Sequence, residues 1–521
     1  MTSPTTAAPT VSSATPRRTV VAAAGAVGAL GLTTGRSQAA TSGSSTVPVL
    51  KGRDRLIASR FSYGITPALA HQVNRRGGGQ AWFEWQLRPE LIADGVTART
   101  KAWWPGLAFS GPDAWKRHVA DMDRGWELMW HYQCWCLQRR ISGPRQVQEV
   151  MAEFWENHFN VSTQHDTAFI YRCDYGEALR DLALGRFSDL LHAATTHPAM
   201  LMYLDQAVST KAHPNENLGR ELMELHTVGR GQYTEDDVKN AARILTGWKV
   251  GLWQDWLPTY AESAHWTGPV QVMGFSDPNA SADGRPLTRS FLDYLAHHPA
   301  TALRIARKLA VKFVRDDPSD ALVQHLAEVY LANDTAITPV LRALIASDEF
   351  RGSAGRKVRD PGEDIVATYR LLNVKVSQPS SEESTANAML WQVGLIGQTP
   401  FSWPRPDGQP ITNAAWSSAS RVINSMDIHY TMSGSWWPTL DARYRSPQQW
   451  VPDFPIRFRT LVDHLSRSIL GRPADAVMLR AAMTSVDLPA DEKITRDHPL
   501  MQWLFPRLLT TFLDSPEFFQ R

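Results

Sequence analysis

The sequence predicts an all-α protein, predominantly helical, with long loops and at most a few short strands. Apolar residues recur at spacings of three and four through most of the chain, which is the period of a helix with one buried face. Alternating, strand-like runs are short, and the best of them is Val270–Phe275. Proline and glycine gather in three stretches that we therefore expect to be loops, 104–112, 253–286 and 398–411.

The first 39 residues have the features of a twin-arginine (Tat) signal peptide. Arg17 and Arg18 precede an apolar run of about 13 residues, shorter than the roughly 20 that span a membrane. Ser-Gln-Ala at 37–39 then forms a small-x-small cleavage site. A general secretory signal with an incidental arginine pair is the alternative. Either signal exports the protein, so we expect a secreted or cell-envelope location, with 40–50 as a linker.

The rest of the chain, 51–521, is expected to form one large helical domain. Two of its segments, 300–350 and 458–518, end in similar sequences, Ala-Ser-Asp-Glu-Phe and Asp-Ser-Pro-Glu-Phe. They predict a duplicated helical module, unless two amphipathic helices simply share a terminus. The helical pattern itself covers 113–139, 147–159, 187–203, 217–227, 236–248, 290–313, 321–332, 338–350 and 363–372.

Composition narrows the range of partners. Removing the signal takes away three arginines and no acid, so the net charge of +2 becomes about −1. Because such a chain has no basic tract, we expect no nucleic-acid partner, and no later run is long enough for a membrane span. The cysteines, Cys134, Cys136 and Cys173, read as free thiols, with a disulfide from Cys173 to one of the others as the alternative.

The densest polar cluster begins at Glu153. On a helix, Glu153, Asn157 and Asn160 share one polar stripe, surrounded by aromatic residues that include Trp155. A solvated helix face normally carries lysine, arginine and glutamate, whereas this segment carries two asparagines and His158. The stripe is therefore expected to face an interior or a cleft.

A second polar stripe follows about 60 residues later. With 100° per residue, Asn217, Glu221 and Glu224 lie within an arc of about 60°, with Arg220 beside them. Two carboxylates one turn apart repel each other, which can raise the pKa of one for general-acid chemistry while the other stays ionised. A structural Arg–Glu network is the alternative. We expect the helices of Glu153 and Glu221 to face each other across one polar cleft.

Metal and cofactor signatures are weak. His-Glu-x-x-His, a Walker A loop, a dinucleotide glycine fingerprint and a nucleophile elbow do not occur in the sequence. His158, His226 and His265 could form a metal site only if three separate elements converged. We therefore predict no cofactor and no metal ligands as the leading interpretation.

The segment 215–248, with Asn-Glu-Asn-Leu-Gly-Arg-Glu-Leu-Met-Glu-Leu-His and Leu-Thr-Gly-Trp, resembles a bacterial family catalogued as domain of unknown function 1800 (DUF1800). Phe-Trp-Glu-Asn-His-Phe at 154–159, two His-Pro-Ala blocks and Lys308-Leu309 follow the same pattern. The likeness extends from about Arg55 to the C-terminus. It implies an exported, largely helical protein without an agreed activity. The chain departs from the family after His265 and at 406–408.

Together these features favour a secreted hydrolase of an extracellular polymer, with polysaccharide as the expected partner. It would be a glycoside hydrolase in which Glu153 or Glu156 works with Glu221 or Glu224 as an acid/base pair. The substrate-binding residues would be Asn157, His158, Asn160, Asn217, Trp155, Trp248 and Arg220.

Two other functions remain open from the sequence. The first is a non-catalytic cell-surface or matrix protein whose polar blocks are buried structural networks. The second is a metal-dependent oxidoreductase that uses His158, His226 and His265.

Overall fold

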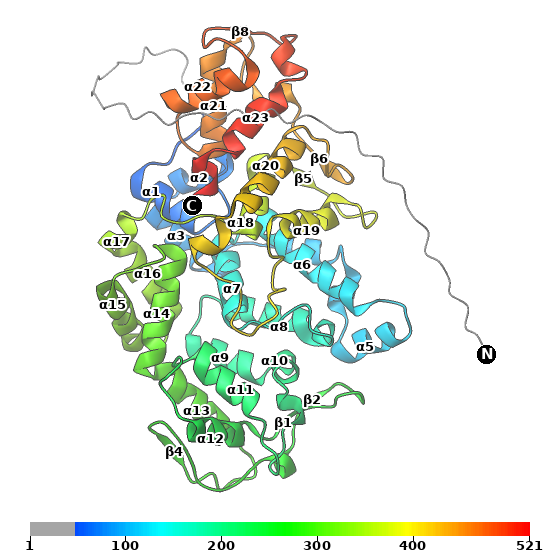
Figure 1. Cartoon of the computed structure of the whole chain (residues 1–521), viewed down its shortest axis with the longest axis vertical. Helices are drawn as coiled ribbons and strands as arrows, with labels where there is room; N and C mark the ends of the chain where they lie inside the picture. The colour runs from blue at the N-terminus through cyan, green and yellow to red at the C-terminus, as the bar shows by residue number, and fades with distance from the viewer. Residues whose placement is uncertain (1–46) are drawn as a thin grey trace, which may run out of the picture. The chain divides into compact units, whose positions relative to one another are not determined.

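The helical periodicity of the sequence is realised almost without exception in the computed structural model, which describes residues 47–521 (Figure 1). Within this range the chain forms 24 α-helices, and no strand is longer than three residues, so the predicted all-α class is confirmed. The predicted signal at 1–39 and most of the linker at 40–50 lie outside the described residues.

The first part of the described chain surrounds one central helix, α7. This helix is buried on nearly every side and packs against α3, α6 and α8 (Figure 1). The elements of this part are α1 (Gly52–Arg60), α2 (Pro67–Arg75), α3 (Gly79–Gln86), η1 (Pro89–Leu91), α4 (Gly95–Lys101), η2 (Pro105–Ala108), α5 (Gly111–Val119), α6 (Gly125–Ser142), α7 (Gln146–His158) and α8 (Ala168–Leu182).

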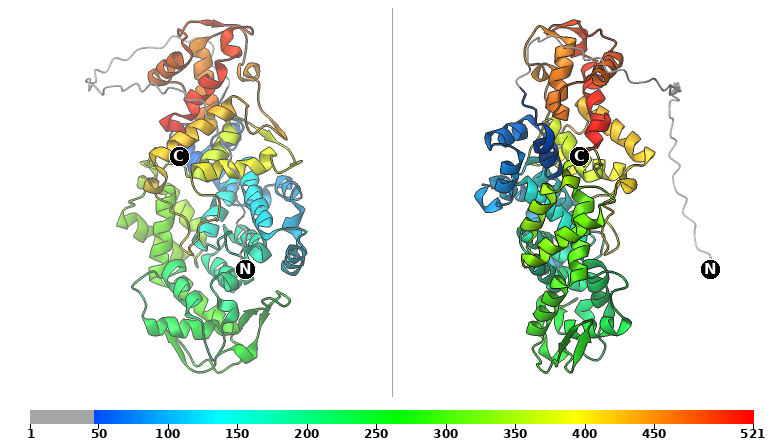
Figure 2. Two further views of the ribbon diagram at one scale, coloured as in Figure 1. Left: turned by 45° about the vertical axis from the view of Figure 1, so that its right-hand side comes forward. Right: turned by 90° about the vertical axis from the view of Figure 1, so that its left-hand side faces the viewer.

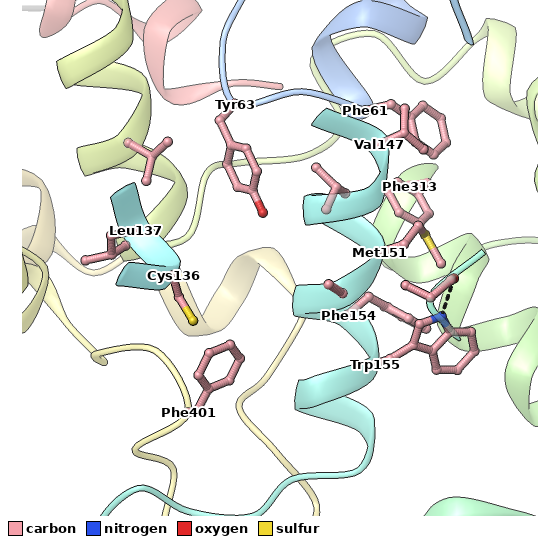
Figure 3. Close-up of a cluster of buried hydrophobic side chains, with 14 of the residues drawn as sticks. Phe61, Tyr63, Cys136, Leu137, Val147, Met151, Phe154, Trp155, Phe313 and Phe401 are labelled. Carbon is pink, nitrogen blue, oxygen red and sulfur yellow. Dashed lines mark hydrogen bonds between the residues drawn. The ribbon is translucent and has the colours of Figure 1, made fainter. Parts of the chain in front are cut away.

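Large apolar side chains pack around α7. Met151 and Phe154 lie on the side of α7 that faces Phe313, Trp155 follows Phe154 along the helix, and these side chains and Phe61 are all buried (Figure 3). The rings of Phe61 and Phe313 stack with their centroids 4.5 Å apart. Burying five such residues stabilises the fold by roughly 1.5–3 kcal/mol each. Since α7 carries the first polar stripe as well, its polar side chains need partners inside the protein.

The middle of the described chain contains the second polar stripe and four of the eight strands. The predicted strand Val270–Phe275 becomes a two-stranded antiparallel hairpin, β3 with β4, and β1 pairs with β2 in the same way. The elements are α9 (Phe187–Thr196), α10 (Pro198–Tyr203), η3 (Gln206–Val208), α11 (Glu216–Glu221), the π-helical η4 (Leu222–His226), α12 (Glu235–Leu245), β1 (Trp248–Val250), β2 (Pro258–Tyr260), η5 (Glu262–Ala264), β3 (Val270–Val272), β4 (Phe275–Asp277) and α13 (Arg285–His297).

The remaining chain includes two groups of four helices, α14–α17 and α21–α24, which are visible in Figure 2 in light green and in orange to red. The elements are α14 (Pro299–Phe313), α15 (Asp320–Ala332), α16 (Ile337–Ala346), α17 (Asp348–Arg351), α18 (Pro361–Leu371), β5 (Lys375–Val376), α19 (Thr385–Ile396), η6 (Asn413–Trp416), α20 (Ala419–Ser433), β6 (Ala442–Arg443), η7 (Pro447–Trp450), β7 (Ile456–Arg457), α21 (Phe458–Leu470), α22 (Ala476–Val486), β8 (Lys493–Ile494), η8 (Pro499–Met501), α23 (Phe505–Leu513) and α24 (Pro516–Phe519).

The long helix expected at 113–139 is two helices in the structure, α5 and α6. The chain leaves the first at Asp121, whose φ of 53° lies in the left-handed region, and re-enters a helix at Gly125. Arg117 forms an ion pair with Asp123 across this turn. The apolar spacing therefore continues in the sequence although the helix does not, and Met122 and Trp126 are exposed.

Among residues 47–521, no helix is both long and apolar enough to cross a membrane. The longest helix that we name, α6, has 18 residues and carries Arg139 and Arg140 in its last turn.

Candidate functional site

The two glutamates of α7 are buried in ion pairs. The Glu153 carboxylate lies 3.0 Å from Arg140 of α6 and accepts a hydrogen bond of 2.7 Å from the hydroxyl of Tyr63. Glu156 lies 2.8 Å from Arg172 of α8 and accepts a 2.5 Å hydrogen bond from Tyr132. A buried charge needs such partners, because leaving it unpaired costs several kcal/mol. Both carboxylates are therefore committed to partners within the protein.

The asparagines of α7 hold a loop. The side-chain amide of Asn157 donates to the carbonyl of Gln409 at 2.9 Å and accepts from its N–H at 2.7 Å. Asn160 donates to the carbonyls of Trp403 and Arg405 at 2.9 and 2.8 Å. The expected loop at 398–411 thus lies against the end of α7. The amide N–H groups expected to bind a ligand serve the backbone of this loop instead.

Glu221 and Glu224 occupy a different environment from the α7 pair. Both side chains are partly exposed, and among residues 47–521 the Glu221 carboxylate makes no hydrogen bond or ion pair. Glu224 accepts a 2.6 Å hydrogen bond from Tyr233 and lies 3.4 Å from the exposed Arg230. The two pairs of glutamates share no partner, so the structure does not bring all four carboxylates into the one polar cleft that we expected.

A π-helical turn separates Glu221 from the residues after it. Residues Leu222–His226 form this turn, directly after α11. Single π turns within helices are rare and occur frequently at functional sites. Because a π turn is wider than an α turn, Glu224 does not point in the direction that α-helical spacing predicts relative to Asn217 and Glu221. It buries His226 beside Leu222 and Met223 and leaves Glu224 at the surface.

The pKa of Glu221 lies above the usual glutamate value. Partial burial is the largest cause, followed by the negative charge of Glu224. Arg220 opposes the shift, and Asp407 of the loop adds to it. Tyr203, which donates a 2.9 Å hydrogen bond to the carbonyl of Pro404, has its pKa raised to about 12 by burial and by Asp407 and Glu221. The loop therefore brings a third acid to the Glu221–Glu224 pair.

Two other candidates lie on α11. Arg220 is bound to Glu235 by two hydrogen bonds of 2.9 and 2.7 Å and lies 3.6 Å from Glu216. Asn217 is partly exposed, and its N–H is capped by Asn215. Arg220 thus takes part in a structural Arg–Glu network, which was the alternative to an acid/base site in the sequence analysis. Its carboxylate partners, however, are Glu235 and Glu216 rather than Glu224.

The two candidate tryptophans differ in exposure. Trp155 is fully buried, and its indole N–H donates to the carbonyl of Ala183 at 2.9 Å (Figure 3). Trp248 is only partly buried and donates to the hydroxyl of Thr288 at 3.2 Å. Trp155 consequently belongs to the core, and of the two only Trp248 has a ring that reaches the surface.

A pocket of about 210 Å³ opens beside the end of α7. His158 lines it together with Lys308 of α14 and with the loop residues Trp403, Arg405 and Asp407. The Nζ of Lys308 lies 2.9 Å from Nδ1 of His158, and Nε2 of His158 lies 3.0 Å from the carbonyl oxygen of His226. Burial and the nearby charge of Lys308 hold the pKa of His158 well below 6.5.

Two of the three candidate metal-binding histidines use both ring nitrogens in other contacts, whereas Nε2 of the buried His226 has no hydrogen-bond partner among residues 47–521. His265 is buried, with Nδ1 2.9 Å from the carbonyl of Thr246 and Nε2 2.9 Å from the amide oxygen of Asn279. His158 uses both ring nitrogens as described above. Over the described range, no group of three or more histidine, cysteine, aspartate or glutamate side chains is arranged to hold a metal ion.

Sequence reasoning missed Asp407, Lys308, Tyr203 and Tyr233 as members of the site. Lys308 and Tyr203 stand in blocks that carry the family resemblance, while Asp407 stands where the chain departs from it. None of the four has a local pattern that signals function. The folded loop places Asp407 near Glu221 and near Lys308 of α14, whereas Tyr203 comes from α10 and Tyr233 from the turn before α12.

The fold and these side chains define a large helical protein with a carboxylate-bearing π turn and an adjoining lysine–histidine pocket. The sequence profile of the protein family of unknown function DUF1800 matches residues 56–520, which is nearly the whole chain. The chain belongs to this family. No curated protein and no solved structure matches it.

Proposed function

We propose that the protein is an exported hydrolase of an extracellular polymer, a glycoside hydrolase in which Glu221 is the general acid and Glu224 the paired carboxylate. The observation that carries the proposal is the contrast between the two side chains. Glu221 is partly exposed, has no partner among the described residues and has a raised pKa. Glu224 is held by Tyr233 and Arg230. Environments that differ in this way separate an acid from an ionised carboxylate.

The chemistry needs one proton donor and one anion. Glu221 would protonate the oxygen of the leaving sugar, and its raised pKa keeps it protonated at higher pH than an ordinary glutamate. Glu224 would stabilise the positive charge that develops on the sugar ring, or activate the attacking water. Asp407 contributes by raising the pKa of Glu221, and Trp248 offers a partly exposed ring near the end of α12.

Release of new reducing ends from a panel of soluble and insoluble glycans tests this proposal. We expect Glu221→Gln and Glu224→Gln to reduce kcat at least about 100-fold, with the melting temperature nearly unchanged because both side chains are partly exposed. Glu216→Gln, on the same helix, is the control and should keep full activity. Wild-type activity that survives in both variants would overturn the assignment.

A non-catalytic surface or matrix protein is the second candidate, and one observation favours it. Both α7 glutamates are internal ion pairs, as expected if the polar blocks stabilise the fold. Under this alternative, the protein releases no new reducing ends from the glycan panel. Glu221→Gln then changes neither the stability of the protein nor its binding to the same glycans. Cleavage of any glycan that is lost in the Glu221 variant would exclude it.

A further inference from the structure

Lys308 is a lysine without an acidic partner in a pocket. Within residues 47–521, no carboxylate oxygen lies within 4.0 Å of its Nζ, and its one hydrogen-bond partner is His158. The contrast with Lys312, one turn further along α14, is informative. Lys312 lies 2.8 Å from Glu363 and 3.6 Å from Asp360, the arrangement of a structural buried lysine. Lys308 has no such structural partner.

The hydrogen bonds define the protonation of His158. The carbonyl oxygen of His226 can only accept, so Nε2 of His158 must carry the hydrogen of this bond. In the neutral ring Nδ1 is then a bare acceptor, and Lys308 donates to it. His158 therefore holds the amine in place and presents a base beside it.

The surroundings of Lys308 favour the neutral amine. Burial is the largest cause that lowers the pKa of Lys308, and the positive charge of Arg304 on the same helix lowers it further, to about 7. Asp407 acts in the opposite direction. His158 and His226, which face the amine from α7 and η4, have lowered pKa values and remain uncharged near neutral pH. Desolvation and a neighbouring cation are the two ways in which proteins activate lysine as a nucleophile.

We infer that Lys308 is a nucleophilic amine that forms a reversible imine with a small aldehyde or ketone bound in the pocket between α7, α14 and residues 403–411. The pocket supplies the room, since about 210 Å³ equals the liquid volume of about seven water molecules at ~30 Å³ each. This volume admits compounds of a few carbon atoms. The activity is separate from the proposed glycan cleavage and does not depend on it.

The reaction balances without a redox partner. The lone pair of Nζ attacks the carbonyl carbon, a C–N bond forms, and the carbonyl oxygen takes up a proton as its π bond opens. That proton comes from the nitrogen through Nδ1 of His158, which gives the neutral carbinolamine. The second N–H proton follows the same route to the hydroxyl group, which leaves as water while the C=N bond of the imine forms. Hydrolysis reverses each step.

Reductive trapping tests the inference on the full mature protein. The probes are glycolaldehyde and hydroxyacetone, each with sodium cyanoborohydride at pH 7.0, and modified lysines are located by peptide mass spectrometry. We expect Lys308 to be alkylated at least tenfold faster than the exposed Lys375 and Lys493, and Lys312 to stay unmodified. Alkylation of Lys308 at or below the rate of the exposed lysines would overturn the inference.

The pH dependence and two variants sharpen this experiment. The rate at Lys308 should level off just above pH 7, whereas the rates at exposed lysines keep rising toward pH 10. Lys308→Arg should remove the fast site. Glu221→Gln should leave it unchanged, so failure of the glycosidase proposal and failure of this one give different results. A rate at Lys308 that keeps rising to pH 10 would count against an activated amine.

Discussion

The role of each glutamate in this protein is decided by the charge that faces it. Glu156 is 1% exposed and lies against Arg172, and its hydrogen bonds leave no room for a ligand. Glu221 is partly exposed, and the charge that affects its pKa most is another carboxylate, Glu224. The first arrangement stabilises the fold, and the second keeps a proton available. The same residue type therefore serves two purposes within about 65 residues.

Glu156→Gln should destabilise the protein strongly. The change leaves the Arg172 guanidinium buried without its counter-charge, and breaking one side of a buried ion pair typically costs about 3–5 kcal/mol. Urea unfolding followed by circular dichroism measures the free energy. Glu221→Gln is the matched control, with an expected change below about 0.5 kcal/mol because its side chain is partly exposed and unpaired. Equal stability of the two variants would contradict the structural role of Glu156.

His429 makes stability depend on pH on the alkaline side. Burial by itself would lower the pKa of this histidine, but the charge of Asp364 and hydrogen bonds to Asp364 and Asp514 raise it to about 9. The distances to the two carboxylates are 3.0 and 2.8 Å. Because the folded pKa exceeds the unfolded value near 6.5, the contribution is full below pH 6.5 and is lost as pH rises through about 9.

Unfolding free energies at pH 6 and pH 9.5 check this expectation. The wild type should lose on the order of 3 kcal/mol between them, the equivalent of the difference between pKa values of 6.5 and about 9. His429→Gln should be less stable than the wild type at pH 6, and it should not show this loss of unfolding free energy between pH 6 and pH 9.5. A wild type with equal stability at both pH values would show that His429 is not protonated in the fold.

At the residue scale, the sequence predicts which side chains are polar but not what they contact. The partners of Glu153 and Glu156 lie 13 and 16 residues away on neighbouring helices. The partners of Asn157 lie 252 residues away. No local pattern contains that information. The Glu221–Glu224 pair was nevertheless recognisable as two acids one turn apart, since their repulsion is a local property.

At the level of helices and strands, several helices begin at a histidine–proline pair. The predicted segments at 187–203 and 290–313 each break at such a pair, because the residue before proline is disfavoured in the α region. His197 and His298 become N-caps, and each accepts a 3.2 Å hydrogen bond from the N–H two residues later. His498 caps η8 in the same way. The apolar spacing continues across these breaks. The sequence therefore predicted one helix at each place where the structure has two.

The loop 403–411 is an element without regular structure that is held by side chains. Asn157 and Asn160 together make four hydrogen bonds to its backbone. This arrangement places Asp407 near Glu221 and Lys308. The sequence predicted a loop here from its prolines and glycines, but its position follows from contacts with a helix more than 200 residues earlier.

Asn157→Ala should therefore release the loop without unfolding the helices. Two hydrogen bonds of 2.9 and 2.7 Å to Gln409 are lost, at roughly 0.5–1.5 kcal/mol each. We expect faster hydrogen exchange confined to 403–411, together with a smaller rise in the pKa of Glu221. Asn333→Ala, which removes an exposed contact to Val329 on α15, is the control and should not affect the loop. Unchanged exchange in 403–411 would contradict the anchoring.

The whole described chain contains two groups of helices in the same order. In each, a long helix is followed by two shorter ones and then by a four-residue helix, α17 or α24. Ser347 and Ser515 cap these last helices through the N–H groups of Phe350 and Phe518, whose rings are buried. The similar sequence endings thus have a shared structural basis in the capped helix. Duplication of the module itself stays a prediction.

The cysteines bear on where the protein folds. Cys134 and Cys136 are fully buried free thiols, and Cys173 is a partly buried one. Burial raises the pKa of each thiol, which keeps it protonated and slow to react. A fold whose described cysteines are free does not need an oxidising compartment in order to form. Export in the folded state would require the fold to form in the reducing cytoplasm, and free thiols are compatible with that requirement.

Export should accordingly depend on the arginine pair. Arg17→Lys with Arg18→Lys preserves the charge and the apolar run but removes the feature that the folded-protein pathway requires, so the precursor should accumulate in the cytoplasm. Cell fractionation with N-terminal sequencing of the exported form, expected near Ala40, measures this. Arg36→Lys, close to the cleavage site, is the control and should be exported normally. If the double variant is exported as well as the wild type, the signal is a general secretory one, and the chain crosses the membrane unfolded.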